Sequence, residues 1–184
     1  MQYVALLRGI NVGGKNPVAM ADLRTALTDR GFSAVQTYIA SGNVLLSADE
    51  AAGGSDADAI QGVFEDLLRT EFSVDTRVLI LPRGRWLAIA AAVPAAWQND
   101  SEQKSDVLFL FPEDDTPEII QRLAPREGID DARYVPGAVL WNIERRNQTR
   151  TALMRIAGTE TYRNLTIRNV NTVRKLTALC AAKW

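Results

Sequence analysis

Residues 35–47 read VQTYIASGNVLLS, and their pattern is the strongest indication of the fold class. Two β-rich runs, Val35–Ala40 and Val44–Ser47, flank the tripeptide Ser41-Gly42-Asn43, which is typical of a tight turn. We therefore predict a hairpin of two antiparallel strands. A sheet that contains such a hairpin differs from the parallel sheets on which phosphate-binding P-loop enzymes are built.

The residues on either side complete a four-stranded unit. Upstream, Tyr3–Arg8 is a β-rich run that ends in glycines, and Asn16-Pro17 predicts the start of a helix that Gly31 ends. Downstream, a predicted loop at 51–59 precedes apolar residues at helical spacing over 60–68 and a strand over 74–81. The order βαββαβ predicts a ferredoxin-like unit, an antiparallel sheet with two helices on one face.

The second half of the chain repeats much of this pattern. After a helix over 85–93, we predict a strand over 106–111, a helix over 117–123, a hairpin that turns at Pro136-Gly137, and a helix over 150–156. We interpret this βαββα order as a degenerate second copy. The sequence thus predicts an α+β fold with two ferredoxin-like subdomains of mainly antiparallel sheets, residues 1–82 and 83–184. A closing helix, with Asn171 as its cap, completes the second.

The composition limits the chemistry. The 184 residues include no His and one Cys, which excludes a Ser-His-Asp triad, histidine ligands to zinc and an intrachain disulfide. We expect Cys180 in the core and predict no metal site, because the acidic cluster at 113–118 matches a helix start. The apolar run 86–97 is interrupted by Pro94 and is shorter than the roughly 20 residues of a membrane span. We expect a cytoplasmic protein that does not insert into membranes.

The charges are distributed unevenly along the chain. Residues 145–184 carry nine Lys and Arg against Glu160 alone, while residues 1–144 have a net charge of −9. Either the basic segment is neutralised by acidic side chains of the same chain, which we favour, or it forms a surface for an anionic partner.

The glycine-rich loop is the first candidate site. Gly9–Asn16, GINVGGKN, fits the spacing of a phosphate-binding P-loop except for its last residue, Asn16, which lacks the hydroxyl that would hold magnesium. Pro17 also removes a backbone donor at the expected helix start. Glycine N–H groups, the helix end, Arg8 and Lys15 still predict an anion site, although a plain turn is the alternative.

The second candidate is the polar run 166–175, TIRNVNTVRK. Asn171 or Thr172 is expected to cap the last helix, which places Arg168 and Asn169 just before its positive end. This position favours a carboxylate, a phosphate or a backbone carbonyl as partner.

Three blocks of the sequence resemble a known family. LLRGINVGGKN at 6–16, YIASGNV at 38–44 and the spaced residues of 166–176 are similar to the bacterial domain-of-unknown-function family 1697. The resemblance covers essentially the whole chain, although this sequence has Ala40 where the family usually shows Gln and Val170 where it usually shows Trp. The resemblance implies ferredoxin-like subdomains and no assigned activity, and it adds Ser41 and Asn43 to the motif positions.

We therefore predict that the protein binds a small anionic or phosphate-bearing ligand. The loop Gly9–Asn16, the turn Ser41–Asn43 and the segment Arg168–Thr172 are expected to converge on one cleft. The predicted ligand-binding residues are Arg8, Asn11, Gly13, Gly14, Lys15, Asn16, Ser41, Asn43, Arg168, Asn169, Asn171 and Thr172. The sequence leaves open whether the protein is an enzyme, which cofactor it uses, what the ligand is and how the chain oligomerises.

The alternative function is a nucleic-acid-binding module that uses the basic C-terminal segment. The topology matches that of the RNA-recognition fold, but the predicted strand Val44–Ser47 lacks the aromatic residues on which that fold stacks bases.

Overall fold

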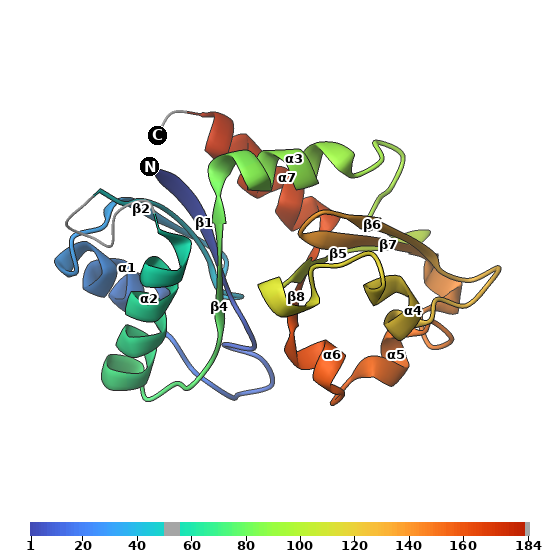
Figure 1. Ribbon diagram of the computed structural model, residues 1–184, viewed down its shortest axis with the longest axis horizontal. Helices are drawn as coiled ribbons and strands as arrows, with labels where there is room; N and C mark the ends of the chain where they lie inside the picture. Colours follow the sequence, from blue (N-terminus) through green and yellow to red (C-terminus); the bar gives the residue numbers. More distant parts are fainter. Residues whose placement is uncertain (50–55, 183–184) are drawn as a thin grey trace. The chain divides into compact units, whose positions relative to one another are not determined.

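The computed structural model describes residues 1–49 and 56–182 (Figure 1). The chain divides into two compact units, the first comprising Met1–Trp86 and Leu179–Trp184 and the second Leu87–Ala178. Most of the loop predicted at 51–59 lies outside the described residues, and the helix that follows it starts at Ala57.

The first unit has the predicted βαββαβ order. Its sheet has the strand order β2-β3-β1-β4, and every paired strand is antiparallel. Both helices lie on one face of this sheet (Figure 1). The elements are β1 (Gln2–Leu7), α1 (Met20–Asp29), β2 (Ser33–Tyr38), β3 (Asn43–Ser47), α2 (Ala57–Phe72) and β4 (Val78–Pro82).

Apolar residues at helical and strand periods form the core of this unit. Leu23 and Leu27 of α1 and the buried face of α2 pack against the alternate strand residues Tyr3, Ala5 and Leu7. At the start of α2, the side chain of Asp56 accepts a hydrogen bond from Asp58 N at 3.0 Å. The hairpin predicted from residues 35–47 is present as β2 and β3.

The start of α1 differs from the prediction. The helix begins at Met20, and Ala19 occupies the N-cap position without a side-chain bond. Asn16, the predicted cap, has a left-handed backbone with φ of 50° and donates from Nδ2 to Gly9 O at 3.1 Å. An N-cap residue normally has an extended backbone, so Asn16 belongs to the preceding loop and α1 begins four residues after it.

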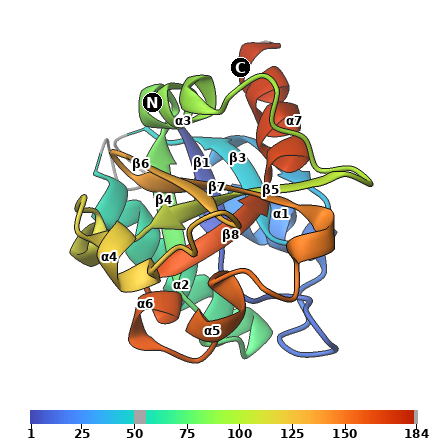
Figure 2. The same ribbon diagram turned by 90° about the vertical axis from the view of Figure 1, so that its right-hand side faces the viewer.

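The second unit has the same topology. Its strand order β6-β7-β5-β8 matches that of the first unit position by position, again with antiparallel pairs. Short helices cover one face of the sheet (Figure 2). The elements are β5 (Gln103–Leu110), η2 (Pro112–Asp114), α4 (Ile119–Leu123), β6 (Asp131–Val135), β7 (Ala138–Glu144), η3 (Arg145–Asn147), α5 (Leu153–Ile156), α6 (Glu160–Arg163) and β8 (Leu165–Asn169). The α+β fold with two ferredoxin-like units is confirmed.

Two elements near the end of the chain correct the sequence analysis. Strand β8 completes the second copy, and the closing helix α7 (Val170–Ala181) begins directly after it. Asn169 caps this helix, because its Oδ1 accepts from Thr172 N at 2.9 Å, so the prediction of Asn171 or Thr172 as the cap is wrong. Helix α3 (Arg83–Ala92) and α7 both contain a boundary between the two units.

Candidate functional site

The glycine-rich loop forms a small β-hairpin of its own. Val12 and Lys15 form an antiparallel bridge, with Lys15 N donating to Val12 O at 3.0 Å, and Asn11 N donates to Asn16 O at 3.1 Å. Gly13 and Gly14 between them have φ of 58° and 75°, the left-handed pair that a type I′ turn requires. The loop therefore has a defined shape without a helix end.

The side chain of Asn11 fastens this hairpin to the rest of the unit. Its Oδ1 accepts from Val18 N at 2.9 Å, and its Nδ2 donates to Val18 O at 2.9 Å and to Ala40 O at 2.8 Å. Since both amide hydrogens are used, Asn11 positions the loop. Asn16 does the same through its bond to Gly9 O.

The turn between β2 and β3 lies beside this loop. Leu7 N donates to Gly42 O at 2.8 Å, and a Cβ on Gly42 would stand 2.7 Å from Leu7 Cβ and 3.0 Å from Ile10 Cδ1. Asn43 is fully buried and donates from Nδ2 to Tyr38 O at 3.0 Å and to Ser41 Oγ at 3.1 Å. The structure thus brings the predicted loop and turn together at one end of the first sheet.

Lys15 and the N–H groups of Gly13 and Gly14 at this end are available to a ligand. Within residues 1–49 and 56–182, no carboxylate pairs with the exposed Lys15, and the N–H groups of Gly13 and Gly14 donate no hydrogen bond. Arg8 lies next to them, half-buried, with its N donating to Arg77 O at 3.1 Å and its O accepting from Thr76 Oγ1 at 2.5 Å.

Arg77 is a residue that the sequence analysis missed. It immediately precedes β4, and β4 runs antiparallel to β1, so the start of β4 lies beside the end of β1 where the glycine loop begins. The predicted βαββαβ topology was the signal that could have identified Arg77. It places the loop after the first strand and the loop before the fourth strand at the same end of the sheet.

The second candidate segment lies in the second unit. Arg168 is buried in β8, where its Nη1 donates to Thr166 Oγ1 and to Ile167 O, both at 2.9 Å. Burial lowers the pKa of this guanidinium to about 10, so it stays charged at neutral pH. Thr172 is buried, and Asn171 Nδ2 donates to Asn99 O at 3.0 Å.

Arg168 therefore directly precedes Asn169, the cap of α7, as expected, but it lies in a strand with its side chain buried. The loop and turn belong to the first unit and Arg168–Thr172 to the second. Their convergence on one cleft stays a prediction of the sequence.

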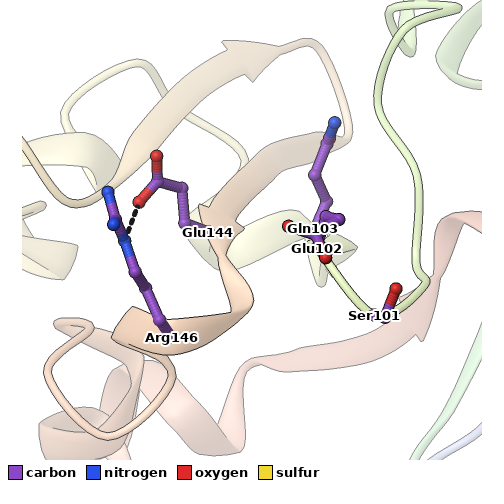
Figure 3. A pocket seen from close by; sticks show the side chains of 5 residues that line it. All are labelled: Ser101, Glu102, Gln103, Glu144 and Arg146. Carbon is purple, nitrogen blue, oxygen red and sulfur yellow. Dashed lines mark hydrogen bonds and ion pairs between the residues drawn. The ribbon is translucent and has the colours of Figure 1, made fainter.

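The basic segment has few carboxylate partners among the described residues. Arg146 Nε lies 2.6 Å from Glu144 Oε2, and both line a shallow depression of about 550 Å³ (Figure 3). Arg145 donates to neutral oxygens, Asn99 Oδ1 at 3.0 Å and Gln103 O at 3.3 Å. In the described chain, no carboxylate pairs with Arg150, Arg155 or Arg163.

The acidic cluster 113–118 contributes to the fold of the second unit. Asp114 Oδ1 pairs with Arg122 Nη1 at 2.7 Å, and Asp115 Oδ1 accepts from Tyr134 OH at 2.9 Å and from Gly137 N at 2.6 Å. Across residues 1–49 and 56–182, no three His, Cys, Asp or Glu side chains gather as metal ligands would. In the same residues, no helix has the length and apolar character to cross a membrane.

Fold and loops together define an α+β protein built from two ferredoxin-like units of identical strand order. The chain belongs to the family described as "Protein of unknown function (DUF1697)", whose model matches residues 1–141. A solved structure, that of the conserved bacterial protein SP0830 from Streptococcus pneumoniae, is similar over 97% of this chain and 98% of its own, with a TM-score of 0.80 and 28% identity. A search of curated proteins found no match.

Proposed function

We propose that the protein binds a small anionic or phosphate-bearing ligand at the end of the first sheet, where the hairpin Gly9–Asn16 meets the turn Ser41–Asn43. Lys15, with Arg8 and Arg77 nearby, supplies positive charge, and Gly13 and Gly14 supply backbone donors. The cytoplasm is the compartment we propose, in keeping with the lone cysteine, Cys180.

One observation carries the proposal. In the described residues, Lys15 Nζ and the N–H groups of Gly13 and Gly14 belong to exposed residues and have no partner in the protein, whereas the side-chain amides of Asn11 and Asn16 bond to backbone groups of the same unit. A loop that holds its shape with one set of polar groups and leaves a second set of donors open is preorganised for an acceptor.

Thermal denaturation in phosphate tests the proposal. Phosphate should raise the melting temperature of the wild type above that in chloride at matched ionic strength. The free energy of unfolding should increase by about 1.4 kcal/mol when the phosphate concentration is tenfold above its Kd. The amide resonances of Gly13 and Gly14 should shift on titration.

Two variants test whether the phosphate effect depends on Lys15. Lys15→Ala should lose the phosphate effect, whereas Arg24→Ala, which removes an exposed cation of α1 in the same unit, should keep it. Equal stabilisation by phosphate and chloride in the wild type contradicts the proposal, because screening alone then explains the effect.

A second candidate is nucleic-acid binding by the basic segment of the second unit. Its support is that Arg150, Arg155 and Arg163 are exposed and have no carboxylate partner in the described residues. We still favour the ligand, because this segment has no interleaved aromatic platform. Filter binding of random single-stranded RNA distinguishes the two functions. Micromolar affinity that falls steeply with salt and is lost in the Arg150→Ala/Arg155→Ala double variant supports the second candidate.

A further inference from the structure

Two exposed aliphatic side chains flank the proposed anion site. Of the large hydrophobic residues that the described chain exposes, Val12 is 62% and Ile39 50% accessible, and both belong to the end of the first sheet. Isolated exposed hydrophobic residues are common on protein surfaces and need no explanation. Two at the same place, beside unused donors, do call for one.

Hydrogen bonds bring the backbones next to these two residues close together. The bond from Asn11 Nδ2 to Ala40 O, 2.8 Å long, joins the residue before Val12 to the residue after Ile39. Val12 and Lys15 are directly opposite in their bridge, and opposite residues of an antiparallel pair project from the same face. The cation and the aliphatic side chain therefore stand side by side.

The backbone conformation of Ile39 disfavours isoleucine. Its φ of 51° is left-handed, a conformation that β-branched residues rarely adopt and that Asn or Gly adopts readily. The residue is 50% exposed, so burial offsets this strain only in part. A side chain that the fold does not require is a candidate for contact with something outside the chain.

We propose that the ligand is a soluble amphiphilic anion, with a phosphate or carboxylate group joined to an aliphatic chain. The charged group lies against Lys15 and the N–H groups of Gly13 and Gly14, and the chain lies across Val12 and Ile39. This inference rests on the proposed function and adds the chemical class of the ligand. The neighbouring exposed side chains are aliphatic, which suits an alkyl chain better than a stacked base.

Alkyl phosphates of increasing length test the inference by calorimetry. Each methylene that becomes fully buried should raise affinity about fourfold, so hexyl phosphate should bind at least tenfold more tightly than methyl phosphate. Val12→Thr and Ile39→Asn should remove this dependence on chain length and leave the affinity for inorganic phosphate within twofold. Met154→Thr, a change at an exposed hydrophobic residue of the second unit, should alter neither.

Ile39→Asn also controls for folding, because relief of the left-handed strain should raise its melting temperature above that of the wild type. Equal affinities for methyl and hexyl phosphate, with inorganic phosphate still bound, overturn the inference and spare the proposed function. Failure of every phosphate to bind overturns both.

Two other results also overturn the inference. In one, the protein dimerises at micromolar concentration and Val12→Thr makes it monomeric, so a second copy covers the patch. In the other, it co-sediments with vesicles that contain phosphatidic acid but ignores soluble alkyl phosphates.

Discussion

The two units share a frame and differ in the loop that follows the first strand of each. Leu7 N donates to Gly42 O at 2.8 Å in the first unit, and the equivalent Leu110 N donates to Gly137 O at 3.0 Å in the second. The strand orders also agree, β2-β3-β1-β4 against β6-β7-β5-β8. The same sheet, covered on one face by helices, is therefore built twice in the chain.

The loops tie themselves to the neighbouring turn with different chemistry. In the second unit a carboxylate does this, as Asp115 Oδ1 accepts from Gly137 N at 2.6 Å. In the first unit a neutral amide does it, as Asn11 Nδ2 donates to Ala40 O at 2.8 Å. The acidic loop of the second unit therefore uses its charge within the fold, whereas the basic loop of the first unit leaves the charge of Lys15 available.

Gly42→Ala should have the largest effect on stability. The new Cβ would stand 2.7 Å from Leu7 Cβ in a residue with φ of 78°, so overpacking adds to the left-handed penalty. We expect a loss of about 2 to 5 kcal/mol in the free energy of unfolding, measured by urea denaturation.

Gly128→Ala in the second unit is the matched control. Gly128 has φ of 71° and open space where a Cβ would lie, so only the backbone penalty of about 1 to 2 kcal/mol applies. Equal losses at the two positions would mean that the close approach of Gly42 to β1 contributes nothing.

Substitution of Asn11 and Asp115, the side chains that bond each loop to its neighbouring turn, should have the next largest effect. Asn11→Asp removes two donors and places a carboxylate against the carbonyls of Val18 and Ala40, for an expected loss of about 2 to 3 kcal/mol. Asp115→Asn keeps an oxygen that accepts from Tyr134 OH and Gly137 N, and we expect about 1 kcal/mol. Equal losses in urea denaturation would contradict the assignment of a donor role to one tether and an acceptor role to the other.

The dependence of stability on pH should differ between the two units at one pair of equivalent positions. Asp106 of β5 corresponds to Tyr3 of β1, and burial raises the pKa of the Asp106 carboxyl despite Lys104 Nζ at 3.7 Å. A raised pKa in the folded state means that stability is highest below the unfolded pKa and is lost as pH rises through the folded pKa.

Asp106→Asn should therefore flatten the loss of wild-type stability that begins as the pH rises above about 4, measured by urea denaturation at a series of pH values. The gain of the variant over wild type should grow with pH. A constant difference at all pH values would show that the carboxyl does not titrate abnormally.

Surface ion pairs should give the smallest effects, and in both units alike. Arg146 and Glu144 are 80% and 57% exposed as side chains, and Arg146→Ala should change the free energy of unfolding by less than about 0.5 kcal/mol. Arg30→Ala in the first unit, where Arg30 Nη2 lies 2.8 Å from Glu71 Oε1, should cost slightly more because Arg30 is less exposed. A loss above 2 kcal/mol at Arg146 in thermal or urea denaturation would contradict this ranking.

Much of the fold follows from local patterns, because apolar periodicity and turn residues act over short distances. The hairpin at Ser41–Asn43 and the one at Pro136-Gly137 were predictable for this reason. Strand β8 was missed because Thr166, Arg168 and Asn169 make its sequence polar, and only its position beside β5 explains why it is a strand. Tertiary pairing overrides composition there.

The positions of the candidate-site residues could be predicted from the sequence, but the hydrogen-bond partners of their side chains could not. Glycines at 13 and 14 indicated a turn, and the turn is there. No local pattern indicates that the side chains of Asn11 and Asn43 bond to backbone carbonyls, since an amide N–H donates to a ligand or to a backbone carbonyl equally well. Roles depend on neighbours that are distant in sequence, as Ala40 is from Asn11.

The boundaries of the units make the second an insertion within the first. The first unit contains Met1–Trp86 and resumes at Leu179, and Arg83 Nε donates to Cys180 O at 3.2 Å across 97 residues of sequence. A ribosome that synthesises this chain has polymerised all of the second unit before it adds Cys180. The N-terminal unit, which begins to emerge first, is thus the last to complete its hydrogen bonds.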